Sequence, residues 1–486
     1  MAVVATPPAE VDAIVAKAAI ASAEWRTSTI VERAQALRTI GDALDAHGDK
    51  LVAIAQSETH LTEARLRGEL RRTTFQLRLF AEVLEEGTWL DARIDHADAD
   101  WPMGAPRPDL RRQLESIGPV LVFSASNFPF AFSVAGGDSA SALAAGNAVV
   151  VKAHRGHPEL SAATSAIVEA ALASVSAPDG LFATIFSQDA GVRALKAPEI
   201  QAGAFTGSIA GGRALFDIAA AREKPIPFYG ELGSVNPAFV TRSAARDRAE
   251  AIAAEFLVSM TGSAGQLCTK PGVLLVPADS GIVELLSAAE LPGAAPLLNE
   301  GIAEGFRQAV DATVAHTDVS VLAGSPSVAG DPAPILLKTT AAALRKDAHG
   351  LISEMFGPAA LIATYDDEAE LLDIAATLEG QLTATVIGTD GDAVATELVS
   401  VLATKAGRVL WNQWPTGVSV TWAQQHGGPY PATTAVGTTS VGAAAITRFL
   451  RPVTYQNMPQ SLLPAALQDA NPLGIPRRID GALIVG

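Results

Sequence analysis

Short apolar runs alternate with stretches of helical periodicity through most of this 486-residue chain. In the first half, the apolar runs lie at 118–125, 147–154, 180–187 and 201–208, with helical stretches at 138–146, 161–175 and 211–222. A buried strand of a parallel sheet reads as a continuous apolar run, and helices form the crossovers between such strands. The alternation therefore predicts a parallel, doubly wound α/β sheet.

The second half repeats this alternation. Helices are expected at 247–260, 367–378 and 391–403, and strands at 272–277, 333–339, 358–365, 382–389 and 408–413. Two separate sheets agree with the length, because one hydrophobic core rarely serves more than about 300 residues. We therefore expect two α/β domains with additional strands.

Three segments stand outside the alternation. Residues 9–58 keep apolar residues at helical spacing, which predicts two or three amphipathic helices, and 61–87 continues as a helix with one basic side. The polar, proline-containing stretch 101–112 indicates a connector or a pair of edge strands. Residues 449–459 are rich in β-forming residues but carry prolines, which is typical of an edge or intersubunit strand.

The charge balance narrows the partners. A net charge of −17 argues against a nucleic-acid backbone or an anionic membrane as partner, because both bind basic faces. Hydrophobic residues make up 49% and charged residues 18%, as in a folded globular protein. We expect an acidic enzyme that acts on a small molecule.

Cysteine and histidine usage argues against a resident metal. The single cysteine, Cys268, excludes an intrachain disulfide and any multi-cysteine metal site. His154 and His157 lie close together in the sequence, but no third ligand accompanies them. We therefore expect no metal.

Two segments bear on location. The N-terminus has no basic region followed by an apolar stretch, so no signal peptide is expected. Residues 117–137 carry no charge over about the length of a membrane span, but their prolines and polar residues favour a buried strand and loop. We expect a cytoplasmic protein.

Four loops carry unusual chemistry, although the dinucleotide-binding GxGxxG, the P-loop and the GxSxG motif are missing. Asn127 follows an apolar run and offers an amide donor, and 205–212 leads through glycines into a helix. Glu231 lies in an otherwise apolar stretch, where a carboxylate near neutral pKa makes a good general base. Cys268 lies in a polar, glycine-containing loop. Taken singly, each has an ordinary structural explanation, such as a turn-forming Asn or a small buried Cys.

Together these segments resemble the aldehyde dehydrogenase superfamily, in order and in spacing. The resemblance runs from about residue 10 to the C-terminus, and its motifs are SNFPF, VVVKAH, FTGS, ELGSVNP, GQLCTKPG and EMFGP. It implies a Rossmann-like cofactor domain (1–98 and 117–232), an α/β catalytic domain (233–440) and a small β oligomerisation element (99–116 and 441–486). Dimers or tetramers are usual in the superfamily, so a homodimer or homotetramer is expected.

The resemblance also assigns catalytic roles. Cys268 would attack the aldehyde carbon as a thiolate, and the Asn127 amide with the Cys268 backbone N–H would hold the oxyanion. Glu231 would activate the water that hydrolyses the thioester. The product is the carboxylate, and the cofactor takes the hydride.

Further residues match the superfamily's cofactor site. Glu354 would bind the nicotinamide ribose with Phe356 nearby, and Lys152 the adenosine ribose; the pyrophosphate would lie against Gly207, Ser208 and Gly212. Many NAD-preferring relatives have an acidic residue where this chain has Arg155, preceded by His154. A cation there suits a 2′-phosphate, so NADP or NAD is expected as cofactor, with NADP favoured. The alternative interpretation of this pair is a solvent-facing basic surface.

A narrower resemblance concerns the substrate. The segments GGPYPATT and TSVGAAAITRFLRPVTYQNMP are similar to those of dehydrogenases of 2-oxoglutarate semialdehyde (2,5-dioxopentanoate). Such a substrate needs a cation for its carboxylate. Among Arg71, Arg72 and Arg78 we favour Arg72, with Phe128 and Phe132 also lining the substrate site. The alternatives are a medium-chain or aromatic aldehyde as substrate, and a catalytically silent structural relative.

Overall fold

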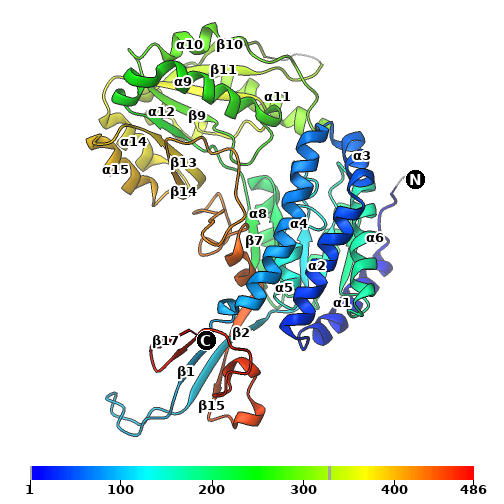
Figure 1. Ribbon diagram of the computed structural model, residues 1–486. Coiled ribbons are helices and arrows are strands. Elements are labelled where there is room, and N and C mark those ends of the chain that lie inside the picture. The colour runs from blue at the N-terminus through cyan, green and yellow to red at the C-terminus, as the bar shows by residue number, and fades with distance from the viewer. Residues whose placement is uncertain (1–2, 327–329, 486) are drawn as a thin grey trace.

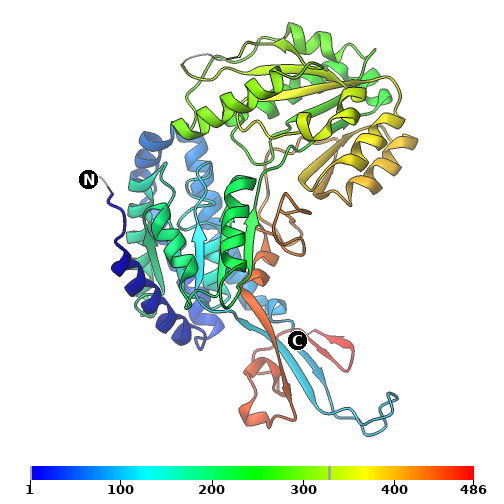
Figure 2. The same cartoon turned by 180° about the vertical axis from the view of Figure 1, so that it is seen from behind.

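The computed structural model describes residues 3–326 and 330–485. Three sheets organise it, and Figures 1 and 2 show the helix-covered body of the molecule from opposite sides. The first sheet has the order β5-β4-β3-β6-β7 and is parallel throughout. Its strands are β3 (Val120–Phe123), β4 (Val149–Lys152), β5 (Phe182–Ile185), β6 (Ala202–Thr206) and β7 (Phe228–Glu231). This confirms the predicted Rossmann-like, doubly wound sheet.

Helices cover both faces of the first sheet. They are α1 (Pro8–Trp25), α2 (Ile30–Ala46), α3 (Gly48–Thr59), α4 (Glu63–Glu86), α5 (Gly137–Ala144), α6 (Pro158–Ser174), α7 (Gln188–Lys196) and α8 (Ile209–Ala220). Helices α5 and α6 pack on the strands, and α2, α3 and α4 lie outside them, whereas α1 packs with α7 and α7 with α8. The Thr62 hydroxyl caps α4, and Gly87 ends it in the left-handed conformation that glycine adopts without strain.

The second sheet has the order β10-β11-β12-β9-β8-β13-β14, and only β10 runs antiparallel to its neighbour. Its strands are β8 (Ala238–Val240), β9 (Val273–Pro277), β10 (Ser320–Ala323), β11 (Ile335–Thr340), β12 (Ala359–Tyr365), β13 (Gln381–Ile387) and β14 (Ala406–Trp411). Its helices are α9 (Arg242–Thr261), α10 (Ile282–Ala288), α11 (Glu300–Val314), α12 (Ala341–Lys346), α13 (Ala348–Leu351), α14 (Ala369–Thr377) and α15 (Ala393–Leu402). Phe256 of α9 and Phe306 of α11 belong to separate apolar clusters, so helices bury both faces of this sheet too.

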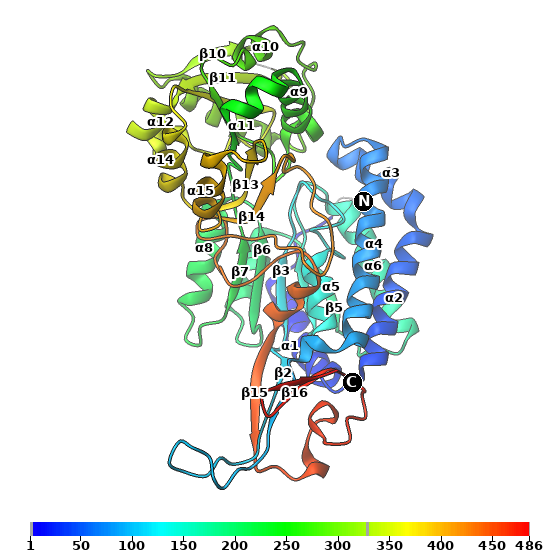
Figure 3. The same cartoon turned by 60° about the vertical axis from the view of Figure 1, so that its left-hand side comes forward.

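The third sheet, which we call the arm, has the order β15-β2-β1-β16-β17 and projects away from the body (Figure 3). It contains β1 (Arg93–Asp95), β2 (Leu110–Ser116), β15 (Leu450–Gln456), β16 (Arg477–Ile479) and β17 (Ala482–Ile484). Strand β15 lies at its edge and pairs antiparallel with β2 from Leu450↔Ser116 to Gln456↔Leu110. Because β1 pairs within the arm, we propose that the boundary of the cofactor domain lies before residue 93 and not at residue 98.

The segment of membrane-spanning length folds as the composition indicated. Residues 117–137 form β3 and the loop that leads into α5. Within the described residues, no helix combines the length and the apolar character that a membrane span requires.

The carboxyl ends of the strands in the first sheet face the amino ends of the strands in the second sheet. Asn127 follows β3, Ser208 follows β6, and Glu231 ends β7, all at the carboxyl edge of the first sheet. Cys268 precedes β9 and Glu354 precedes β12, at the amino edge of the second sheet. Parallel sheets bind ligands beyond the carboxyl ends of their strands, and only the first sheet follows that rule here. The loops of Cys268 and Glu354 instead precede their strands.

Candidate active site

Cys268 lies on a tightly wound loop between α9 and β9. Ser263, Ala264 and Gly265 have φ of 52°, 51° and 68°. A β-carbon at Gly265 would lie 2.1 Å from the carbonyl oxygen of Gly357, so only glycine fits there. The Asn236 amide donates to the carbonyl of Cys268 at 2.8 Å and to that of Lys270 at 3.0 Å. The backbone on both sides of the thiol is thus held in one geometry.

Glu231 and Cys268 are joined through a histidine that the sequence analysis did not identify. The Nε2 atom of His426 lies 2.8 Å from Oε1 of Glu231 and 3.6 Å from Sγ of Cys268. The Ser440 hydroxyl donates to the other Glu231 oxygen at 2.6 Å. Glu231 and His426 are 4% and 1% exposed, whereas Cys268 is only half-buried. A nucleophile, an imidazole and a carboxylate therefore form one contiguous chain.

Burial and nearby charges set the protonation states of Cys268 and Glu231. Burial raises the pKa of the Cys268 thiol well above its usual value, the charge of Glu231 raises it further, and Arg72 opposes both. Burial also tends to raise the pKa of Glu231, but the charge and hydrogen bond of His426 and the hydrogen bond of Ser440 outweigh it and lower that pKa. Glu231 is therefore a carboxylate, and the expectation of a near-neutral pKa is wrong for it. The thiol is neutral and needs a base to react.

The loop that carries Asn127 is fastened to α4. Oε1 of the buried Glu69 accepts the backbone N–H groups of Phe130 at 2.8 Å and of Ala131 at 3.0 Å. Arg65 donates to the carbonyl of Asn127 at 2.7 Å and to the hydroxyl of Ser263 in the cysteine loop. Arg65 thus ties together the two loops that would supply oxyanion donors.

The Asn127 side chain faces the cysteine loop. Its amide donates to the carbonyl of Gln266 at 3.2 Å, two residues before Cys268. The side chain is 7% exposed. An amide held this close to the nucleophile loop can turn its N–H toward a developing oxyanion.

Two aromatic rings and Arg72 line the approach to this chain. Phe128 and Phe132 are half-buried, and their centroids lie 5.3 Å apart. The Phe132 ring lies 6.3 Å from that of His426, and the guanidinium of Arg72 lies 5.2 Å from the Phe132 centroid. Nη1 of Arg72 is buried and has no hydrogen-bond partner within the described residues. A buried, unpaired guanidinium N–H is costly unless a ligand satisfies it.

The other two arginines named from the sequence differ from Arg72. Arg71 is exposed. Arg78 is engaged by Asp42 and Asp45 at 2.6 and 2.7 Å on the outer surface. The structure therefore brings only Arg72, of these three, next to the cysteine.

Lys152 ends β4, and His154 and Arg155 follow it. Lys152 is half-buried, and its side chain makes no hydrogen bond or ion pair in the described part of the chain. Burial and the charge of Arg155 lower its pKa. Burial, with the nearby charges of His157, Lys152 and Arg155, lowers the pKa of His154 to about 3. His154 is thus uncharged at neutral pH and accepts the N–H of Gly156. The positive charge here comes from Lys152 and Arg155.

The glycine-containing turn after β6 opens α8. The hydroxyl of Ser208 caps this helix by accepting the N–H of Gly211 at 3.2 Å. Gly207 and Ser208 are exposed, so a ligand can reach the helix N-terminus. A β-carbon at Gly212 would lie 2.1 Å from a methyl carbon of Leu232, so this buried glycine allows close packing of the helix.

Glu354 stands beside a buried lysine. Lys270 donates to the carbonyls of Met355 and Ala359 at 2.9 and 2.6 Å. Burial raises the pKa of Glu354 to about 7 although Lys270 opposes it, and burial lowers the pKa of Lys270 to about 8. Phe356 is half-buried two residues further on. Glu354, not Glu231, is the carboxyl with a near-neutral pKa.

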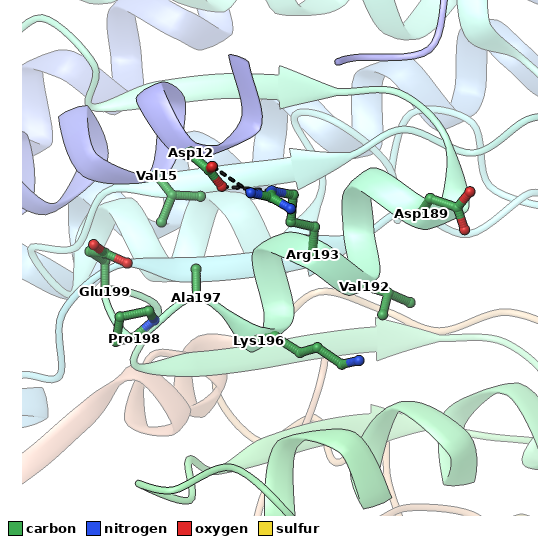
Figure 4. Close-up of a pocket in the computed structure, with 9 residues that line it drawn as sticks. All are labelled: Asp12, Val15, Asp189, Val192, Arg193, Lys196, Ala197, Pro198 and Glu199. Carbon is green, nitrogen blue, oxygen red and sulfur yellow. Dashed lines mark hydrogen bonds and ion pairs between the residues drawn. The ribbon is translucent and has the colours of Figure 1, made fainter. Parts of the chain in front are cut away.

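A separate hollow lies far from these residues, between α1 and α7. It is lined by Asp12, Val15, Asp189, Val192, Arg193, Lys196, Ala197, Pro198 and Glu199 (Figure 4). The Arg193–Asp12 ion pair crosses it at 2.5 Å, with both side chains about half exposed. None of the site residues named above lines it.

Comparison with known proteins identifies the class. The Aldehyde dehydrogenase family model matches residues 1–452, and the chain belongs to this family. It is therefore an oxidoreductase that acts on aldehydes with NAD(P).

Individual relatives extend the match to almost the whole chain. The alpha-ketoglutaric semialdehyde dehydrogenase of Acinetobacter baylyi is 42% identical over 98% of this chain and 91% of its own length. Alpha-ketoglutaric semialdehyde dehydrogenase 2 of Azospirillum brasilense is 44% identical over 94% and 88%. The crystal structure of lactaldehyde dehydrogenase from Escherichia coli shares the fold, with a TM-score of 0.79, 21% identity and coverage of 93% and 92%.

Proposed function

We propose that this enzyme oxidises 2-oxoglutarate semialdehyde to 2-oxoglutarate through a thioester on Cys268. The observation that carries the proposal is the chain Cys268–His426–Glu231 beside the unpaired guanidinium of Arg72. Cys268 supplies the nucleophile and Glu231 its base, and Arg72 can bind the distal carboxylate of the substrate. The two semialdehyde-oxidising relatives support the same substrate.

The reaction begins with loss of the thiol proton. Because the pKa of Cys268 is raised, the thiol passes its proton to the Glu231 carboxylate, with which it shares a hydrogen bond, as Sγ attacks the aldehyde carbon. The Asn127 amide and the Cys268 backbone N–H stabilise the oxyanion that forms. The bound nicotinamide cofactor supplies the hydride acceptor. After Glu231 has released the thiol proton to solvent, it takes a proton from the water that attacks the thioester. The C–S bond then breaks, the acid leaves, and the Cys268 sulfur takes up a proton.

The residues present fit a nicotinamide cofactor. Lys152 is partly buried and unpaired, and Ser208 opens the exposed N-terminus of α8. Two phosphates at that N-terminus and a ribose at Lys152 would satisfy both features. Glu354 would hold the second ribose, with Phe356 beside it.

NADP is the proposed preference. Arg155 reaches the N-terminus of α11, where a β-carbon on Gly301 would lie 2.7 Å from its Nη2 atom. The Nδ2 atom of Asn299, which caps the same helix, is buried without a partner in the described residues. A guanidinium and a helix N-terminus both attract an anion, so a 2′-phosphate between them would be stabilised.

Kinetics with both cofactors test this preference. Arg155→Glu should lower kcat/KM with NADP by about tenfold or more and leave NAD within a few-fold. A wild-type enzyme that strongly prefers NAD would overturn the NADP assignment.

Substrate selection is tested at Arg72. Arg72→Ala should raise KM for 2-oxoglutarate semialdehyde by about a hundredfold, because a charge-assisted hydrogen-bond pair is lost, and should change KM for a neutral aldehyde much less. Arg71→Ala, on the exposed side of the same helix, is the matched control. Equal effects on both substrates would remove Arg72 from the pocket and favour a medium-chain or aromatic aldehyde.

A catalytically silent relative is the alternative of a different class. It would lack activity on every aldehyde tested, and the retention of Cys268 and Glu231 argues against it. We also propose that the enzyme acts in the cytoplasm, where a free catalytic thiol stays reduced, and that it forms a homodimer or homotetramer through the arm.

A further inference from the structure

Cys268, His426 and Glu231 together make a donor set of a kind known for metal binding. Each of the three side chains offers one ligand atom, and these three atoms lie within 4.8 Å of one another. Thiolate, imidazole and carboxylate are the three side-chain ligands that Zn²⁺ takes in proteins. Each of the three comes from a different segment: β7, the loop before β9 and the long loop after β14.

The spacing of the donor atoms suits a tetrahedral ion. With Zn–S of about 2.3 Å and Zn–N or Zn–O of about 2.0 to 2.1 Å, tetrahedral geometry separates sulfur from nitrogen by about 3.6 Å and nitrogen from oxygen by about 3.3 Å. The observed separations are 3.6 Å between Sγ and Nε2 and 2.8 Å between Nε2 and Oε1. Opening the Glu231–His426 contact by about half an ångström would therefore accommodate the ion.

Two of the three ligands have outer partners, whereas Nδ1 of His426 has none within the described residues. Ser440 fixes the second oxygen of Glu231 at 2.6 Å, and Asn236 fixes the carbonyl of Cys268 at 2.8 Å. Outer partners of this kind raise metal affinity, because the ligands lose little freedom on binding. The thiolate and the carboxylate also balance the charge of a divalent ion, which lowers the cost of burying all three.

We propose that the Cys268–His426–Glu231 cluster binds Zn²⁺ reversibly and that the bound ion inhibits the enzyme. On binding, the Cys268 S–H bond breaks, a Zn–S bond forms and the proton leaves to solvent, with no change of oxidation state. The ion then occupies the nucleophile and the base together. The half-buried thiol leaves the fourth coordination position to water, and chelation restores the free cluster.

Alkylation of Cys268 tests the proposal without relying on activity. The intact enzyme is titrated with zinc chloride in a thiol-free buffer and treated with iodoacetamide, and mass spectrometry measures alkylation of its one cysteine. We expect one equivalent of zinc to protect Cys268, and EDTA to reverse the protection. His426→Gln and Glu231→Gln should each raise the half-protecting zinc concentration at least about tenfold. His47→Gln, which removes an exposed histidine of the surface, should leave it unchanged.

Two results would overturn the site. Protection of the same strength in wild type, His426→Gln and Glu231→Gln would mean that zinc binds the thiol alone. Zinc bound without protection would place it elsewhere on the protein. Melting temperatures confirm that each variant is folded, and the readout stands whether or not the enzyme oxidises 2-oxoglutarate semialdehyde.

Discussion

At Cys268, burial and the charge of Glu231 keep the thiol protonated, and Arg72 opposes them only in part. A neutral thiol is a poor nucleophile, so the enzyme needs a base within reach of Sγ. The Glu231 carboxylate shares a hydrogen bond with the thiol and is the base, and the Nε2–H of His426 stabilises that carboxylate. Reactivity at this position thus comes from the neighbours of the thiol.

Replacing His426 with Gln should lower kcat about tenfold, because the base Glu231 loses the charge and the hydrogen bond that keep it ionised beside the thiol. The KM for aldehyde should change no more than a few-fold, since the imidazole does not bind the distal carboxylate. Steady-state rates across pH measure both quantities. A kcat within twofold of wild type would mean that His426 does not support Glu231 as the base.

Cofactor affinity should depend on pH through Glu354. Burial raises the pKa of this carboxyl to about 7, so it is mostly protonated at pH 6 and mostly ionised at pH 8. A carboxylate accepts both ribose hydroxyls, so the cofactor Kd should fall several-fold between these pH values. In Glu354→Gln the cofactor Kd should be higher and should not change with pH. An equally steep profile in that variant, measured by calorimetry, would assign the titration to another group.

Helix α4 acts as one element in holding the site. From successive turns it presents Arg65, Glu69 and Arg72 to the loops of Asn127 and Cys268 and to the substrate approach. Burial raises the pKa of Glu69 while Arg65 and two backbone N–H groups lower it. The helix therefore positions the two oxyanion donors, the Asn127 amide and the Cys268 backbone N–H, relative to each other.

Glu69→Ala should destabilise the protein by about 2 to 4 kcal/mol, because two buried N–H groups lose their acceptor. The kcat of Glu69→Ala should fall as well, while its cofactor Kd stays near that of wild type. Glu69→Gln keeps an acceptor oxygen and should retain more of both properties. Glu82→Ala, on the exposed side of α4, is the control. Unchanged melting temperature and kcat in Glu69→Ala would contradict this role.

Most strands could be predicted from the sequence, because buried parallel strands such as β3, β4 and β9 are largely continuous apolar runs. Strand β10 escaped prediction because it is a partly exposed edge strand. His426 and Ser440 lie in a loop without periodicity, and they reach Glu231 only because this loop pairs with β7 at Glu231↔Thr433. Arg65 and Glu69 were read as part of a basic helix face, since a sequence does not show which helical side chains face a distant loop.

At the scale of the whole molecule, the arm has an exposed apolar surface that packing within a single chain does not explain. Strand β17 exposes Leu483 and Ile484 to 63% and 46% at the edge of the arm. Exposed apolar strand edges favour pairing with another copy. The sequence predicted an edge strand in this region but could not count subunits, because an interface leaves no periodic pattern.

Light scattering should give a mass of two or four times 50.0 kDa for the wild-type enzyme. Ile484→Asp should shift the population toward the single chain, because a buried charge at an interface is costly. Val258→Asp, at an exposed valine of α9, should leave the mass unchanged. A wild-type mass of 50.0 kDa would contradict an oligomer.

The central claim is that the aldehyde carbon becomes a thioester on Cys268, and trapping that thioester tests it most directly. In Glu231→Gln the thiol is free of the carboxylate charge that raises its pKa and can still ionise, whereas the hydrolytic water has no base, so hydrolysis should be slower than acylation. Rapid acid quench after mixing with NADP and 2-oxoglutarate semialdehyde should therefore show the 2-oxoglutaryl group on the peptide that contains Cys268. Cys268→Ala should carry no acyl group and form no NADPH. NADPH formation by Cys268→Ala, or an acyl group on any other residue, would contradict the account.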